Sequence, residues 1–178
     1  DGAIEEAVIG GDGPDRNVIS ANLGNGVNIG PGRQPEARVR VEGNLIGIAA
    51  NGEALGNRSY GILVFQPNAN NGFNLTAKSN VLAANGQGVV LTRILSGTTP
   101  TSRGQIRIDD NWIGLTPDGR SLPNIEAGIS IGGPVGGVQR ALLRGNRIGP
   151  HPGVRPVRLF NQVTNPSAPQ NLALIIPA

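Results

Sequence analysis

Three carboxylates stand at related places in the chain and are the first candidates for chemistry. Asp15, Glu42 and Asp109 each lie two residues before an asparagine. If these asparagines mark successive layers of one structure, strands about 4.8 Å apart would carry the carboxylates on one outer face. Two carboxyl groups about 5 Å apart can cleave a glycosidic bond. One hypothesis for function is therefore a polysaccharide lyase or glycoside hydrolase that acts on a glycan along this face.

The same alignment has a structural interpretation. Lys78 and Arg144 also lie two residues before an asparagine, so the column holds both signs of charge. In chain order it contains Asp15, Glu42, Lys78, Asp109 and Arg144. Opposite charges on neighbouring strands attract weakly, by about 0.2–1 kcal/mol per pair. We expect a charged surface ladder, no catalytic residue and no cofactor.

A metal site has little support in the sequence. The segment GGDGPD at residues 10–15 fits the calcium-binding turn of β-rolls, but such turns bind calcium in tandem and the chain has one copy. The chain has no cysteine, and His151 is its only histidine. We therefore expect no metal, and we expect His151, which lies in a Pro-His-Pro-Gly turn, to be solvated.

Composition and charge restrict the partners. The 178 residues carry a formal net charge of +3, but residues 1–53 hold eight acids and four arginines, whereas residues 127–178 hold five arginines and no acid. Aromatic residues make up 3% of the chain and are not interleaved with basic ones, so we expect no nucleic-acid binding. No apolar run is long enough to span a bilayer, so we expect no membrane insertion.

One short element recurs five times. It opens with an asparagine, and an aliphatic residue follows two positions later. The asparagines are Asn17, Asn44, Asn80, Asn111 and Asn146, and the aliphatic residues are Ile19, Ile46, Leu82, Ile113 and Ile148. The first and third copies are short and the second and fourth are long. Alternating apolar and polar residues precede the asparagines, and a glycine-led apolar stretch follows each of the first four copies, which is typical of short strands.

A repeat of this size cannot bury its apolar face alone and must stack on its neighbours. No helical period is present, and the chain has 28 glycines. We predict an all-β protein, a right-handed parallel β-helix of about five to six coils. The aliphatic residues would form a core column. The asparagines would form a turn column, with left-handed backbone angles and side-chain amides that bond to the coils above and below.

The repeats extend over about residues 8–149, within a single domain at 1–178. Residues 150–178 are expected to form a C-terminal coil or cap, in which the apolar stretch 172–176 covers the last coil or pairs with a neighbour. The chain has no initiator methionine and no signal-peptide pattern, so we expect it to be a piece of a larger product.

The repeats resemble those of secreted bacterial right-handed β-helix proteins, whose fold is related to that of pectate lyases. The sequence IGG at residues 9–11, RNVISAN at 16–22 and GVNI at 26–29 matches one half of that family's double repeat. Residues 44–64 and 111–133 match the other half, and the resemblance covers most of residues 8–149. It implies a large exported surface protein.

These features lead to one expected function. We expect an extracellular or cell-surface module with a structural or adhesive role. Its partners would be copies of itself stacked head to tail in a filament, flanking domains of a larger surface protein, or surface glycans. The acidic first third and basic last third would make the two ends complementary.

Overall fold

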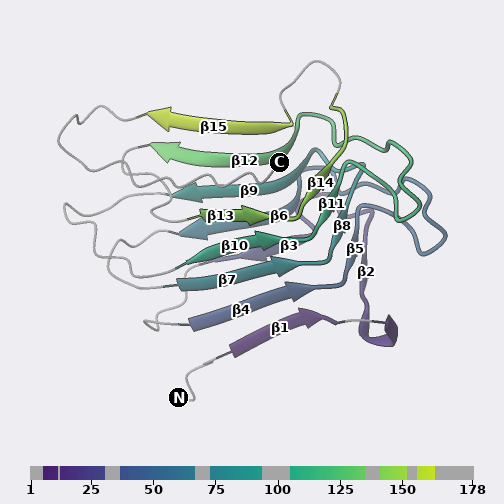
Figure 1. The fold of residues 1–178 in the computed structure, drawn as a ribbon, viewed down its shortest axis with the longest axis horizontal. Helices are drawn as coiled ribbons and strands as arrows, with labels where there is room; N and C mark the ends of the chain where they lie inside the picture. Colours follow the sequence, from purple (N-terminus) through teal and green to yellow (C-terminus); the bar gives the residue numbers. More distant parts are fainter. Residues whose placement is uncertain are drawn as a thin grey trace.

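The computed structural model describes residues 6–11, 13–30, 37–66, 73–93, 105–134, 141–151 and 156–162. Over these ranges the chain forms three parallel sheets of five strands each (Figure 1). The first sheet contains β1 (Glu6–Gly10), β4 (Ala37–Glu42), β7 (Phe73–Lys78), β10 (Ile106–Asp109) and β13 (Ala141–Arg144). The second contains β2 (Val18–Ile19), β5 (Leu45–Ile46), β8 (Val81–Leu82), β11 (Trp112–Ile113) and β14 (Arg147–Ile148). The third contains β3 (Val27–Ile29), β6 (Tyr60–Gln66), β9 (Gln87–Arg93), β12 (Ala127–Pro134) and β15 (Val157–Gln162).

Every third strand along the chain belongs to the same sheet. One coil therefore contributes one strand to each of the three sheets, and the next coil lies directly on it, from β1 at one end to β15 at the other (Figure 1). The protein is a right-handed parallel β-helix with five coils in the described residues. The predicted fold class is confirmed.

Alternation along the strands divides the interior from the surface. In β10, Ile106 and Ile108 are buried, whereas Arg107 and Asp109 point outward and are partly exposed. Successive side chains of a strand face opposite sides of its sheet, so each strand places every second residue in the core. Apolar side chains from all three sheets meet inside, among them the fully buried Ile46, Ile62, Leu82, Ile108 and Ile129.

The register of the second sheet stacks the aliphatic residues that follow the repeated asparagines. Parallel pairing aligns Ile19 with Ile46, Ile46 with Leu82, Leu82 with Ile113, and Ile113 with Ile148. The three central side chains are fully buried and the two outer ones are partly buried. The structure thus places the predicted core column in one continuous row.

The turn between the first and second sheets has its left-handed residue immediately before the asparagine. Gly43, Ser79, Asp110 and Gly145 have φ values of 67°, 54°, 54° and 61°. The expectation that the asparagines themselves would have left-handed angles is wrong, because the repeated asparagines are not among the residues with positive φ. The asparagines contribute their side chains to this turn, and the residue before four of them supplies the left-handed backbone angle.

Among the described residues, the second and fourth coils are those that carry a hairpin. Ile48 bridges to Ala54 in one hairpin, and Leu115 bridges to Ser121 in the other, both antiparallel. Both hairpins project on the side of the second sheet (Figure 1). A second apolar cluster lies outside the main core there and contains Leu45, Ile48, Val81 and Ala83, with Trp112 and Leu122 packed against it.

The fifth coil is completed by β15, which pairs with β12. Part of the segment expected to be a C-terminal coil or cap therefore supplies the last strand of the third sheet. The apolar stretch 172–176 lies outside the described residues. No helix among the described residues is long and apolar enough to cross a membrane.

Candidate functional site

The repeated asparagines form a continuous hydrogen-bonded stack, the first ladder. Asn44 donates from its main-chain N–H and its Nδ2 to Oδ1 of Asn80, at 3.0 Å in both cases. Asn80 makes the same two bonds to Asn111, and Asn17 and Asn111 make them to Asn44 and Asn146. The second Nδ2 hydrogen of Asn80 reaches the carbonyl of Val41 in the preceding coil at 2.7 Å. The ladder therefore links all five coils.

A second ladder lies at the other end of the short second-sheet strands, and sequence reasoning missed it. Asn22 donates to Oδ1 of Asn57, Asn57 to Oδ1 of Asn85, and Asn85 to Oδ1 of Asn124. The spacing between asparagines in the sequence contained a signal for this second ladder. The second asparagine follows the first by five residues in the short coils and by thirteen in the long ones, because the hairpin inserts eight.

His151 takes the fifth place in the second ladder. It follows Asn146 by five residues, as Asn22 follows Asn17, and it is only 6% exposed. The expectation that it would be solvated is wrong, because the turn carries it to the ladder position, where a Cβ on Gly114 would lie 2.7 Å from its Cε1. Nδ1 lies 2.8 Å from the carbonyl oxygen of Gly149, and Nε2 lies 3.4 Å from Nδ2 of Asn124.

These contacts define the proton position on the ring. A carbonyl oxygen can only accept, so Nδ1 of His151 carries the hydrogen and Nε2 accepts from Asn124. Burial lowers the pKa of His151 from its ordinary value of 6.5, and the hydrogen bond to Gly149 opposes this shift. The neutral ring is therefore the form that completes the second ladder.

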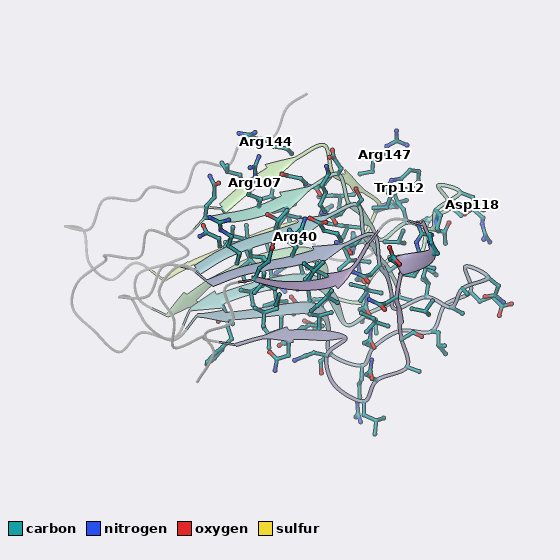
Figure 2. All side chains as sticks on the ribbon, turned by 90° about the horizontal axis from the view of Figure 1, so that it is seen from below. Arg40, Arg107, Trp112, Asp118, Arg144 and Arg147 are labelled. Atoms are coloured by element: carbon teal, nitrogen blue, oxygen red, sulfur yellow. The ribbon has the colours of Figure 1, made fainter. Side chains whose placement is uncertain are left out.

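The outward-facing charges of the first sheet stack in register. Pairing aligns Glu42 with Lys78, Lys78 with Asp109, and Asp109 with Arg144. Arg40, Arg107 and Arg144 lie on this outer face (Figure 2). The structure thus brings together four of the five residues predicted for the charged ladder.

Asp15 does not belong to this column, and its assignment there is wrong. Gly10 occupies the position beside Glu42, while Asp15 ends the short 3-10 helix η1 (Gly13–Asp15). The reason is a local insertion. Six residues separate Gly10 from Asn17, whereas Gly43 alone separates Glu42 from the next asparagine. Counting back from Asn17 therefore reaches the helical turn and not the strand.

On this face, Arg40–Glu42 and Arg107–Asp109 are ion pairs between residues two apart along one strand. The ion pair Arg40–Glu6 joins neighbouring strands, at positions outside the charged column. Nε of Arg40 lies 3.0 Å from Glu6 and its Nη1 lies 3.6 Å from Glu42, while Nε of Arg107 lies 3.3 Å from Asp109. Within the described residues, no ion pair joins successive members of the charged column. Nε of Arg107 and Oδ1 of Asp109 are buried and make no hydrogen bond to a described residue.

The proposed catalytic carboxylates are not brought together as a set. Lys78 lies between Glu42 and Asp109 in the register, which puts these two carboxylates about 9.6 Å apart at two strand spacings. Asp15 lies outside the sheet. Glu42 and Asp109 are therefore too far apart for the retaining geometry of about 5 Å.

Trp112 is half-buried at the edge of the outer apolar cluster. The guanidinium of Arg147 in the next coil lies 4.7 Å from the centre of its ring, and the two side chains lie together in Figure 2. This stacking covers the tryptophan with a side chain of the protein itself. A cation–π contact of this kind contributes about 0.5–1 kcal/mol at an exposed site.

The possible calcium turn and other metal sites gain no support. Asp12 lies outside the described residues, and Asp15 is exposed on η1. Among the described residues, no three carboxylate, histidine or cysteine side chains come together to hold a metal ion.

Comparison with known proteins found no matching family model, no significantly similar curated protein and no significantly similar solved structure.

Proposed function

We propose that this chain is an extracellular structural or adhesive β-helix module, which joins end to end with copies of itself or forms part of a larger surface protein. One observation carries the proposal: the buried polar side chains are used for structure. Six asparagines and His151 are stacked in the two ladders. Thr116 bonds within its hairpin, and Ser130 donates to Gln87 at 2.6 Å. No convergent polar cluster remains inside the described part of the molecule.

The arrangement suits a rigid spacer. Each coil is joined to the next by three sheets and two side-chain ladders, and the aliphatic core runs through all five coils. A stack of this kind resists bending because any hinge would break several parallel sets of hydrogen bonds at once. The resemblance of the repeats to those of secreted bacterial β-helix proteins supports an extracellular setting.

A glycan screen tests the structural role against an enzymatic one. The purified chain is incubated with acidic and neutral polysaccharides, and both new reducing ends and unsaturated products are measured. The proposal expects no turnover. Turnover that Asp109→Ala abolishes and Asp118→Ala leaves intact would overturn it, because Asp118 is a carboxylate on the exposed hairpin, away from the charged face (Figure 2).

A polysaccharide lyase or glycoside hydrolase is the second candidate, and one observation favours it. Arg107 and Asp109 form an ion pair on the outer face, in which Nε of Arg107 and Oδ1 of Asp109 are buried without a hydrogen bond to a described residue. Unsatisfied buried polar atoms mark places where a ligand group can bind. The same glycan screen decides this candidate, with Asp109→Ala as the informative variant.

The extracellular location has its own test. Antibodies against the chain should label intact cells of the producing organism, and protease added outside should remove that label. Labelling that requires permeabilised cells would contradict the proposed location.

A further inference from the structure

The first ladder has a direction. In every step the earlier asparagine donates from its main-chain N–H and Nδ2, and the Oδ1 of the later asparagine accepts. The end near coil one therefore presents an acceptor, Oδ1 of Asn17, to which no described residue donates. The end near coil five presents the main-chain N–H of Asn146, which donates to no described residue.

The sheets end in the same complementary way. Among the described residues, β1, β2 and β3 are edge strands at one end, and β13, β14 and β15 are edge strands at the other. Because all strand pairing within the three sheets is parallel, one end of the stack can continue the other without a change of direction. Unpaired strand edges are templates for adding another chain.

The charges of the two ends are opposite. Among the residues that the structure describes, the first coil carries Glu6, Asp15 and one arginine, Arg16, and the fifth coil carries Arg144, Arg147, Arg158 and no carboxylate. Like ends would repel and unlike ends would attract, so electrostatics favour head-to-tail over head-to-head contact. The hairpins that the described residues form lie in the second and the fourth coils, not in the first or the fifth.

We propose that two copies of the chain stack in one defined register, in which coil one of one copy lies on coil five of the other. This inference rests on the end-to-end assembly proposed above and specifies its interface. Continuing the observed pairing places Asn17 on Asn146 and Val18 on Arg147. The first ladder then runs through the junction without interruption.

The second ladder loses its side-chain donor at the same junction. Continuing the register places Asn22 over His151, but the neutral imidazole has its one hydrogen on Nδ1, directed at Gly149, and accepts at Nε2. No ring donor remains for Oδ1 of Asn22, which keeps only the main-chain N–H of His151 as a donor, as in the other steps of this ladder. The first ladder offers Oδ1 of Asn17 two donors, the main-chain N–H and Nδ2 of Asn146, so loss of Asn17 weakens the junction more than loss of Asn22.

Disulfide trapping tests the register, because the chain contains no cysteine of its own. Val18 is 46% exposed and Arg147 is also exposed, and both face outward in the second sheet. Adjacent strands place their Cα atoms about 4.8 Å apart, within the range that a disulfide spans. On mild oxidation, V18C/R147C should form a series of covalent multimers on a non-reducing gel.

The matched control is N28C/R147C. Asn28 is an exposed, outward-facing residue of the same first coil, but it lies on the third sheet and would meet Arg158 and not Arg147. This variant should stay monomeric on the gel, as should each single variant. Circular dichroism and thermal melting establish that all variants fold as the wild type does.

The outcomes separate this inference from the broader proposal. Self-association in native light scattering without trapping of V18C/R147C would overturn the register and leave assembly standing. Dimers of V18C alone would show that like ends meet and would overturn the head-to-tail arrangement. Monomers in every native measurement would overturn both.

Discussion

At the scale of single residues, the asparagine side chain joins coils that the sequence places 27 to 39 residues apart. Its amide offers two donors and an acceptor in one plane, so the same residue can donate forward and backward and accept from the coil before it. Aspartate lacks the donors, and serine and threonine have only one. A column in the interior turn of this β-helix therefore requires asparagine, or a residue that can reproduce part of its bonding.

Replacing Asn80 tests the first ladder. Asn80→Ala leaves donors of Asn44 and the carbonyl of Val41 without partners in a fully buried site. Each unsatisfied buried group costs about 1–3 kcal/mol, so the free energy of unfolding should fall by about 3 kcal/mol or more. Urea denaturation measures the change. Asn28→Ala, an exposed asparagine outside both ladders, should change it by less than about 0.5 kcal/mol.

His151 makes stability depend on pH in a defined direction. Its pKa in the folded protein is lower than the ordinary value of 6.5, because burial disfavours the imidazolium. The unfolded chain therefore binds the proton first, and the stabilisation present above pH 6.5 is lost as the pH falls towards the folded pKa. The loss cannot exceed about 1.4 kcal/mol per pH unit for one group.

The matched variant for this prediction is His151→Asn, which restores an asparagine at the ladder position. Between about pH 7.5 and pH 5, the thermal unfolding midpoint of the wild type should fall as the pH falls. The midpoint of the variant, which has no histidine, should change less over the same range. Equal slopes in the two proteins would show that His151 does not control this pH dependence.

At the scale of elements, close approach between coils decides where glycine is required. Gly47 has φ of 86°, and a Cβ there would overlap the carbonyl oxygen of Ala83 and the side chain of Asn85 in the next coil. Gly47→Ala should therefore destabilise the fold by about 3 kcal/mol or more, through overpacking and an unfavourable left-handed backbone.

Gly24 is the control for that substitution. It is exposed, its φ is not in the left-handed region, and no atom lies within 4 Å of the position that a Cβ would take. Gly24→Ala should change the free energy of unfolding by less than about 0.5 kcal/mol. Similar losses in the two variants would mean that the coils are not packed at Gly47 as the structure shows.

The elements also show what the sequence could and could not predict. The alternating strands and the repeated asparagine predicted the sheets and the β-helix, because both depend on local spacing that is constant from coil to coil. The second ladder escaped because the eight-residue hairpin shifts Asn57 and Asn124 relative to Asn22 and Asn85. Asp15 was misplaced by the insertion before Asn17. Counting positions from one repeated asparagine identifies the wrong residue wherever a coil contains an insertion.

His151 shows a different limit. A histidine between prolines has the composition of an exposed turn, and only its distance from Asn146 relates it to the asparagines of the second ladder. Its role comes from stacking on Asn124, a contact between coils that no local pattern encodes. The same holds for Arg147, which covers Trp112 from the next coil.

At the scale of the whole molecule, the acidic first coil and the basic end of the chain make association sensitive to salt. Attraction between exposed charges is screened over about 10 Å at 0.1 M salt and over about 3 Å at 1 M. Raising NaCl from about 50 mM to about 1 M should therefore reduce light scattering by assembled material. Scattering that does not change over this range would argue against electrostatic attraction between the ends.

If the five coils of one copy continue into the next copy as one stack, a filament has a fixed axial repeat per copy. Electron microscopy of concentrated protein at low salt tests this stacking most directly, because the axial repeat of a filament reports how its subunits meet. Five strand spacings of about 4.8 Å predict filaments that repeat every 24 Å or so along the axis. Isolated prisms, or filaments with a clearly different repeat, would contradict the account.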